Sequence, residues 1–170
     1  FWFYQGMEEG VPDLGYSRPI PAGAVEGVGE AACKGQRFKL WQDTTGVCKF
    51  ATHGLSGLLG GFGTGAVDAA VGWAAMDKDE ALSVGERIAV LQRLTMLYRG
   101  YRPESDFDIS ERMLSIPSGP AKEFAVPVGP HLAMWREEYY KVAGWDPATG
   151  SPMAATLSRL GLSRLVVGKR

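Results

Sequence analysis

An acid, a glycine and a cysteine stand close together in the stretch QDTTGVCKFATHG at residues 42–54. Asp43 precedes Cys48 by five residues, a spacing that would point the two side chains apart on an ideal helix. Gly46 lies between them and can adopt the left-handed conformation that a turn requires. A carboxylate accepts two parallel N–H bonds from a flat, guanidine-like edge such as that of a pterin, and a thiolate is a standard ligand of iron–sulfur clusters. A turn at Gly46 would let Asp43 and Cys48 serve two neighbouring redox groups.

Cys48 has other interpretations. A single cysteine before Lys-Phe is typical of a small buried side chain. A nucleophilic cysteine would need His53 or His131 nearby in space, and no cysteine-hydrolase signature surrounds Cys48. Zinc needs about four ligands, and the two cysteines and two histidines contain neither a C-x-x-C nor an H-x-x-x-H pair. His53 stays open between a structural imidazole beside the turn and a proton-transfer role.

The glycines of GGFGTGAVDAA at residues 60–70 suggest a dinucleotide-binding loop at first sight. Their spacing is G-x-G-x-G rather than G-x-G-x-x-G, and no strand is predicted before them. We therefore expect close packing of a helix or a loop there. Four tryptophans with apolar neighbours are expected in a core or an interface rather than in a stacking platform: Trp41, Trp73, Trp135 and Trp145.

Composition excludes several classes of protein. The chain has 170 residues, 45 % of them hydrophobic and 22 % charged, as expected for a globular domain. A net charge of -1, with no long run of like charges, gives no sign of nucleic-acid binding. Two cysteines favour a reducing compartment, so we expect a cytoplasmic protein. The weakly charged segment at residues 54–76 is glycine-rich and interrupted by Asp68, which argues against a membrane span.

The beginning of the chain differs in character from the rest. FWFYQG contains no initiator Met, basic region or cleavage pattern, so it is not a signal peptide. Four aromatic residues at an end must be covered, which indicates a piece of a longer protein or a partner of another chain. Residues 4–36 are rich in Gly and Pro and predict an irregular connector, followed by a short amphipathic turn in GQRFKLWQ. We divide the chain into a connector at 1–41, continuing from a missing N-terminal part, and a helical domain at 42–170 with a cofactor-binding turn at 43–50.

The remaining pattern is helical. From Ala81, apolar residues recur at steps of three and four until Gly100, and Ser83 with Glu86 predicts a capping box. A second helix is predicted from Pro130 to Gly144.

A third helix is expected from Ser151-Pro152 to Gly161, and Asp108 with Glu111 predicts a short capped turn. A lone short strand at 165–167 would be the only sheet element. The predicted fold class is thus mainly α, an irregular helical region with long Gly/Pro-rich connectors and little or no sheet.

Four motifs, in order, resemble the aldehyde ferredoxin oxidoreductase family. D-T-T-G-V-C-K-F at residues 43–50 is similar to that family's D-x-x-G-L/V-C-K-F element. The segments ALSVGERIAVLQRLTMLYRGYRPESDFDISERML (81–114), EEYYKVAGWDPATGSP (137–152) and LSRLGL (157–162) resemble its C-terminal helical region. YQGMEEGVPDL near the start is a weaker match.

The resemblance implies an enzyme with tungsten, or molybdenum, on two pterin dithiolenes beside a [4Fe-4S] cluster. Such enzymes oxidise aldehydes to carboxylic acids and pass electrons to ferredoxin. Carried over to this chain, the resemblance implies that Asp43, Gly46 and Val47 contact one pterin and that Cys48 is the last of four cluster ligands. The family's other three cluster cysteines, in a C-x-x-C-x-x-x-C run, and its N-terminal pterin-binding domain are absent from these residues. They would belong to an N-terminal part of the enzyme or to a companion chain, which would share both cofactors.

Two alternatives remain at this stage. The first is a subunit of the same family that acts on another substrate, such as a ring-reducing acyl-CoA reductase, because the same cofactors can run a reduction. The second is a non-catalytic helical assembly domain that has lost its cofactors.

Overall fold

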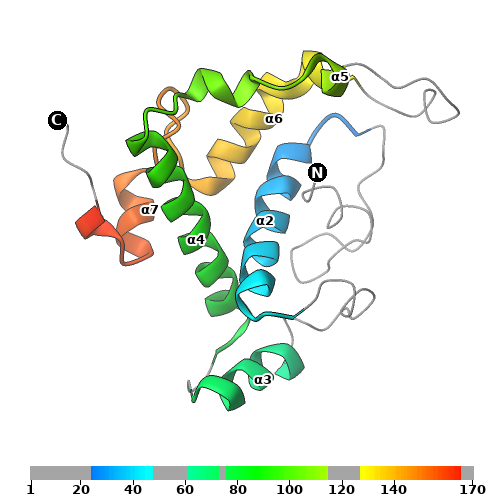
Figure 1. The fold of residues 1–170 in the computed structure, drawn as a ribbon. Coiled ribbons are helices and arrows are strands. Elements are labelled where there is room, and N and C mark those ends of the chain that lie inside the picture. Colours follow the sequence, from blue (N-terminus) through cyan, green and yellow to red (C-terminus); the bar gives the residue numbers. More distant parts are fainter. Residues whose placement is uncertain (1–23, 48–60, 73–75, 115–126, 166–170) are drawn as a thin grey trace, which may run out of the picture.

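The computed structural model describes residues 24–47, 61–72, 76–114 and 127–165, and these residues are mainly helical (Figure 1). Within them lie α2 (Val28–Thr44), α3 (Gly61–Val71), α4 (Lys78–Tyr98), η3 (Pro103–Phe107), α5 (Glu111–Leu114), α6 (Val128–Ala143), α7 (Ala154–Arg159) and η5 (Ser163–Leu165). The described part contains no β-strand, and its isolated bridge pairs Trp145 with Pro152. The predicted mainly α class is confirmed.

Helix α2 corrects the prediction of an irregular connector. Residues 28–41, assigned to that connector, form most of a 17-residue helix. Glycine there serves close packing rather than helix breaking, because a Cβ on Gly29 would lie 1.9 Å from the Trp135 carbonyl oxygen of α6. Glu138 of α6 also caps the helix, since its carboxylate accepts the N–H groups of Gly27 and Gly29 at 3.0 and 2.9 Å. A negative group at a helix N-terminus is favourable, and here it comes from more than a hundred residues away.

Helix α4 begins earlier than predicted. Asp77 is its N-cap, and the Asp77 carboxylate accepts the Glu80 N–H at 2.8 Å. The capping box predicted at Ser83 and Glu86 is therefore wrong, because both residues lie inside the helix and Glu86 is buried. The predicted end is confirmed, since the helix stops at Tyr98 and Gly100 has a φ of 89°.

The two later helices follow the predicted pattern closely. Helix α6 ends at Ala143, and the following Gly144 has a φ of 66°, the left-handed conformation expected after a helix. Helix α7 starts just after Met153 and is followed by Gly161 at φ 71°. The strand predicted at 165–167 is not supported at Leu165, which ends η5, and its other two residues lie outside the described part.

Helix α2 packs against both α4 and α6, and these three helices meet in the centre of Figure 1. A Cβ on Gly85 of α4 would lie 1.8 Å from the Arg37 carbonyl oxygen, so the α2 and α4 backbones touch at this point. Three clusters of buried apolar residues result: Trp41, Met76 and Ala81; Cys33, Tyr140, Ala143 and Trp145; Val90, Leu157 and Leu160. The core placement predicted for Trp41 and Trp145 is confirmed, whereas Trp135 is half-buried and Trp73 lies outside the described residues.

The glycine-rich segment at residues 61–71 forms helix α3, which confirms the helical alternative of its prediction. The close packing expected there is absent at Gly65, because nothing lies within 4 Å of a Cβ built on it. Among the helices of the described residues, none has the length and apolar character needed to cross a bilayer.

Candidate functional site: the turn after helix α2

The predicted site residues lie at the C-terminal end of α2. Asp43 is in the last turn of the helix, with 54 % of its side chain exposed, and its carboxylate contacts the Lys39 ammonium one turn earlier. Gly46 has a φ of 73°, which is the left-handed bend predicted from the sequence. Val47 is exposed. Cys48 and His53 lie outside the described residues, so their placement stays a prediction.

Two threonines build this turn locally. The Thr44 hydroxyl donates to the Trp41 carbonyl at 2.6 Å, and the Thr45 hydroxyl donates to the Gln42 carbonyl at 2.7 Å. These bonds satisfy carbonyls that the end of a helix leaves without an intrahelical partner. The Gly46 N–H donates to the Asp43 carbonyl at 3.3 Å, which closes the turn. The sequence D-T-T-G thus ends the helix and reverses the backbone within four residues.

Burial of Trp41 determines where Asp43 points. Trp41 is 1 % exposed and packs with Met76 and Ala81. Residues two apart on a helix are rotated by about 200° at 3.6 residues per turn. Asp43 therefore faces outward because Trp41 faces inward. The result is a half-exposed carboxylate on a well-anchored helix end, able to accept N–H bonds from a group outside this part of the chain.

The other cysteine is unsuited to metal binding. Cys33 is 2 % exposed, and burial raises the pKa of its thiol to about 11, with a smaller opposing effect from the nearby Arg37 guanidinium. A thiol held protonated is a poor ligand, because metals bind the thiolate. Nowhere in the described residues do three or more His, Cys, Asp or Glu side chains gather closely enough to hold a metal ion.

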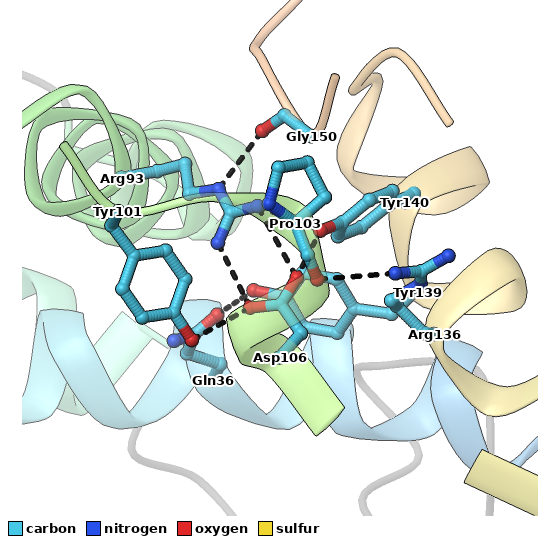
Figure 2. A network of polar contacts seen from close by, with 9 residues as sticks. All are labelled: Gln36, Arg93, Tyr101, Pro103, Asp106, Arg136, Tyr139, Tyr140 and Gly150. Carbon is cyan, nitrogen blue, oxygen red and sulfur yellow. Dashed lines mark hydrogen bonds and ion pairs between the residues drawn. The ribbon is translucent and has the colours of Figure 1, made fainter. Parts of the chain in front are cut away.

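A polar network between α4, η3 and α6 was not predicted as such (Figure 2). At its centre, the Asp106 carboxylate accepts two N–H bonds from Arg93, at 3.0 and 3.2 Å, and the Tyr101 hydroxyl at 3.0 Å. The Tyr140 hydroxyl also donates to Asp106. Arg93 Nε donates to the Gly150 carbonyl at 2.9 Å, which ties in the connector after α6. The residues of this network lie within the segments 81–114 and 137–152, whose resemblance to the family is the one sequence signal that links them.

The bonding of this network indicates a structural role. Burial, followed by the hydrogen bond to Asp106, raises the pKa of Tyr140 to about 12. Asp106 already accepts from three side chains, so little of its capacity remains for a substrate. We therefore assign the network to holding α4 and α6 together.

A second buried carboxylate joins three helices. Glu86 of α4 is 5 % exposed and accepts N–H bonds from Arg159 of α7 at 2.7 and 3.0 Å. Arg37 of α2 forms an ion pair with it at 3.0 Å and also donates to the Val142 carbonyl of α6 at 2.8 Å. Glu86 is thus a fixed connection between α2, which carries the candidate turn, and the rest of the helices.

The described helices form a helical domain that packs around three apolar clusters and the buried Glu86 carboxylate, with an exposed acid at the turn after α2. Comparison with known proteins places this helical domain in a family. The sequence profile of the family "Aldehyde ferredoxin oxidoreductase, domains 2 & 3" matches residues 3–162. The chain belongs to the aldehyde ferredoxin oxidoreductase family, as the sequence resemblance predicted.

Curated relatives give the same result. A "Tungsten-containing aldehyde ferredoxin oxidoreductase" of Pyrococcus horikoshii is 32 % identical over 126 residues, which are 73 % of this chain and 19 % of the relative. The protein of the same name from Pyrococcus furiosus is 35 % identical over 129 residues, covering 71 % of this chain and 19 % of the relative. The chain therefore spans about a fifth of the length of these relatives. No solved structure gives a significant match.

Proposed function

We propose that this chain is the C-terminal helical part of a tungsten, or molybdenum, pterin aldehyde:ferredoxin oxidoreductase. Asp43, with Gly46 and Val47, would contact one pterin, and Cys48 would be one of four ligands of a [4Fe-4S] cluster. The N-terminal part of the same enzyme, or a companion chain, would supply the other ligands. The family match and the names of the relatives support this assignment.

The outward-facing turn after α2 is the observation that carries the proposal. Asp43 is half-exposed, the left-handed Gly46 reverses the chain, and Val47 is 41 % exposed next to it. An ionised carboxylate offers about four lone-pair positions, so Asp43 can contact Lys39 and still accept N–H bonds from a pterin edge. The Asp43 carboxylate at this turn is therefore an acceptor of the kind that a pterin edge requires.

The cofactors would supply the chemistry, namely oxidation of an aldehyde to a carboxylic acid at the metal and transfer of the electrons through the cluster to ferredoxin. The residues of this chain would hold and orient those groups. Trp41 anchors the helix end, Gly46 sets the bend, and Asp43 would fix the pterin edge by hydrogen bonds. We place the enzyme in the cytoplasm, where free thiols persist in a reducing environment.

The two cysteines provide a matched test. In the complete native enzyme, Cys48→Ser is expected to lower the iron and sulfide content and to slow electron transfer to ferredoxin, because a cluster ligand is lost. Cys33→Ser is the control, since Cys33 is buried in the core with a raised thiol pKa, and it should leave the iron content unchanged. An unchanged iron content in Cys48→Ser would refute the ligand assignment.

Metal analysis and substrate assays separate the alternatives. Wild-type enzyme without iron, and without tungsten or molybdenum, would favour the non-catalytic assembly domain. Enzyme with full cofactors that leaves aldehydes unchanged but reduces an aromatic acyl-CoA would favour the other member of the family.

A further inference from the structure

Helix α3 contains one acidic residue, Asp68, whose carboxylate accepts a backbone N–H from beyond the end of the helix. Both Asp68 carboxylate oxygens lie within hydrogen-bond distance of the Met76 N–H, at 3.1 and 3.0 Å, across eight residues. A hydrogen bond to an ionised acceptor is roughly twice as strong as one between neutral groups. Asp68 therefore fixes the backbone position of Met76, the residue that directly precedes the N-cap of α4.

Met76 in turn supports the end of α2. Its side chain is 8 % exposed and belongs to the same buried cluster as Trp41 and Ala81. Val67, the neighbour of Asp68 in α3, packs against this cluster from the same helix. Close-packed interiors transmit small displacements, so a shift at Met76 is passed to Trp41.

Trp41 connects this packing to the candidate site. Asp43 faces outward because Trp41, two residues earlier on the helix, faces inward. A rotation of α2 about its axis that changes the position of Trp41 would therefore also change the direction of the Asp43 carboxylate. We infer that Asp68 is a positioning residue for Asp43 and acts through Met76 and Trp41. The inference rests on the proposed function, in which Asp43 holds a pterin.

Asp68→Asn in the complete native enzyme is the direct test. The amide places an N–H₂ donor where one oxygen accepted, and the charge is lost. We expect kcat to fall about tenfold with a smaller change in KM, because catalysis is sensitive to displacements below 1 Å. The potential at which the EPR signal of the metal develops should also shift, since that signal depends on the pterin environment and not on global stability. Met76→Ala should shift the signal in the same way and provides a second variant if Asp68→Asn does not fold.

Asp146→Asn is the matched control. The Asp146 carboxylate likewise accepts backbone N–H groups, from Ala148 at 3.1 Å and Thr149 at 2.7 Å, in the connector between α6 and α7. This connector is fixed to Arg93 through Gly150, and Arg93 lies about 18 Å along α4 from Ala81 at 1.5 Å per residue. The same chemical change there should leave both kcat and the metal signal as in the wild type.

Two results would overturn the inference alone. The first is a wild-type metal signal and kcat at full metal occupancy in Asp68→Asn, or in Met76→Ala if Asp68→Asn does not fold. The second is an equal change in Asp146→Asn. A wild-type enzyme that contains neither tungsten nor molybdenum would instead overturn the proposed function, and this inference with it.

Discussion

Replacement of Gly85 by alanine tests the contact that holds α2 against α4. The new Cβ would lie 1.8 Å from the carbonyl oxygen of Arg37 and 2.7 Å from its carbonyl carbon. Real Cβ atoms essentially never come closer than 3.0 Å to another heavy atom. Both partners belong to helix backbones, which cannot rotate away as a side chain can. The helices must therefore separate by about 1.2 Å, and this would also carry Arg37 away from Glu86.

Overpacking of this kind costs about 1–3 kcal/mol, and a backbone contact belongs at the upper end of the range. Alanine regains about 1 kcal/mol from its better helix propensity. We expect a net loss of about 2 kcal/mol, which corresponds to an equilibrium constant for local opening that is about 30-fold larger. Hydrogen exchange of the α2 and α4 amides in the complete enzyme measures this directly, because it reports each helix separately.

Gly65 in α3 provides the control, since nothing lies within 4 Å of a Cβ built there. Gly65→Ala should stabilise α3 by about 0.5–1 kcal/mol, because a helical glycine is replaced without a clash. The reasoning would be refuted if Gly85→Ala left the exchange of α2 and α4 at the wild-type rate, or if Gly65→Ala caused the larger loss.

Two further predictions concern buried ionisable groups. Glu86→Gln should lower the free energy of unfolding by about 2 kcal/mol, because it leaves Arg37 without its counter-charge. The expected loss is smaller than for a fully buried ion pair, because the side chain of Arg159, the other partner of Glu86, is 55 % exposed. Thermal denaturation checks it, and a melting temperature equal to that of the wild type would contradict it. Cys33 should resist alkylation between pH 8 and 10 until the protein is unfolded, because burial raises its thiol pKa from 9.0 to about 11. The same raised pKa implies that the free energy of unfolding falls as the pH rises from 9 to 11, because the Cys33 thiol loses its proton at a lower pH in the unfolded chain than in the folded one. Alkylation of folded Cys33 at pH 9 would disprove the raised pKa.

Local signals in the sequence were sufficient for the helices that carry their own start and stop residues. Helices α4, α6 and α7 each end one or two residues before a glycine in the left-handed conformation, namely Gly100, Gly144 and Gly161. Each of these glycines follows an apolar period of three to four in the sequence. The bend at Gly46 has the same origin, so the backbone of the candidate turn could be anticipated from D-T-T-G alone.

Tertiary contacts decided what local signals could not. Helix α2 was missed because its glycines resemble helix breakers. In the structure, Gly29 instead leaves room for the backbone of Trp135. The cap of the helix comes from Glu138, which lies in a distant segment of the chain. The direction of Asp43 was equally hidden, because it depends on which face of α2 receives Met76 and α4. Propensity and capping act over a few neighbouring residues, and so a sequence can encode where a helix ends. The face that a helix buries, and hence the direction of its functional side chain, is decided by contacts between segments far apart in the chain.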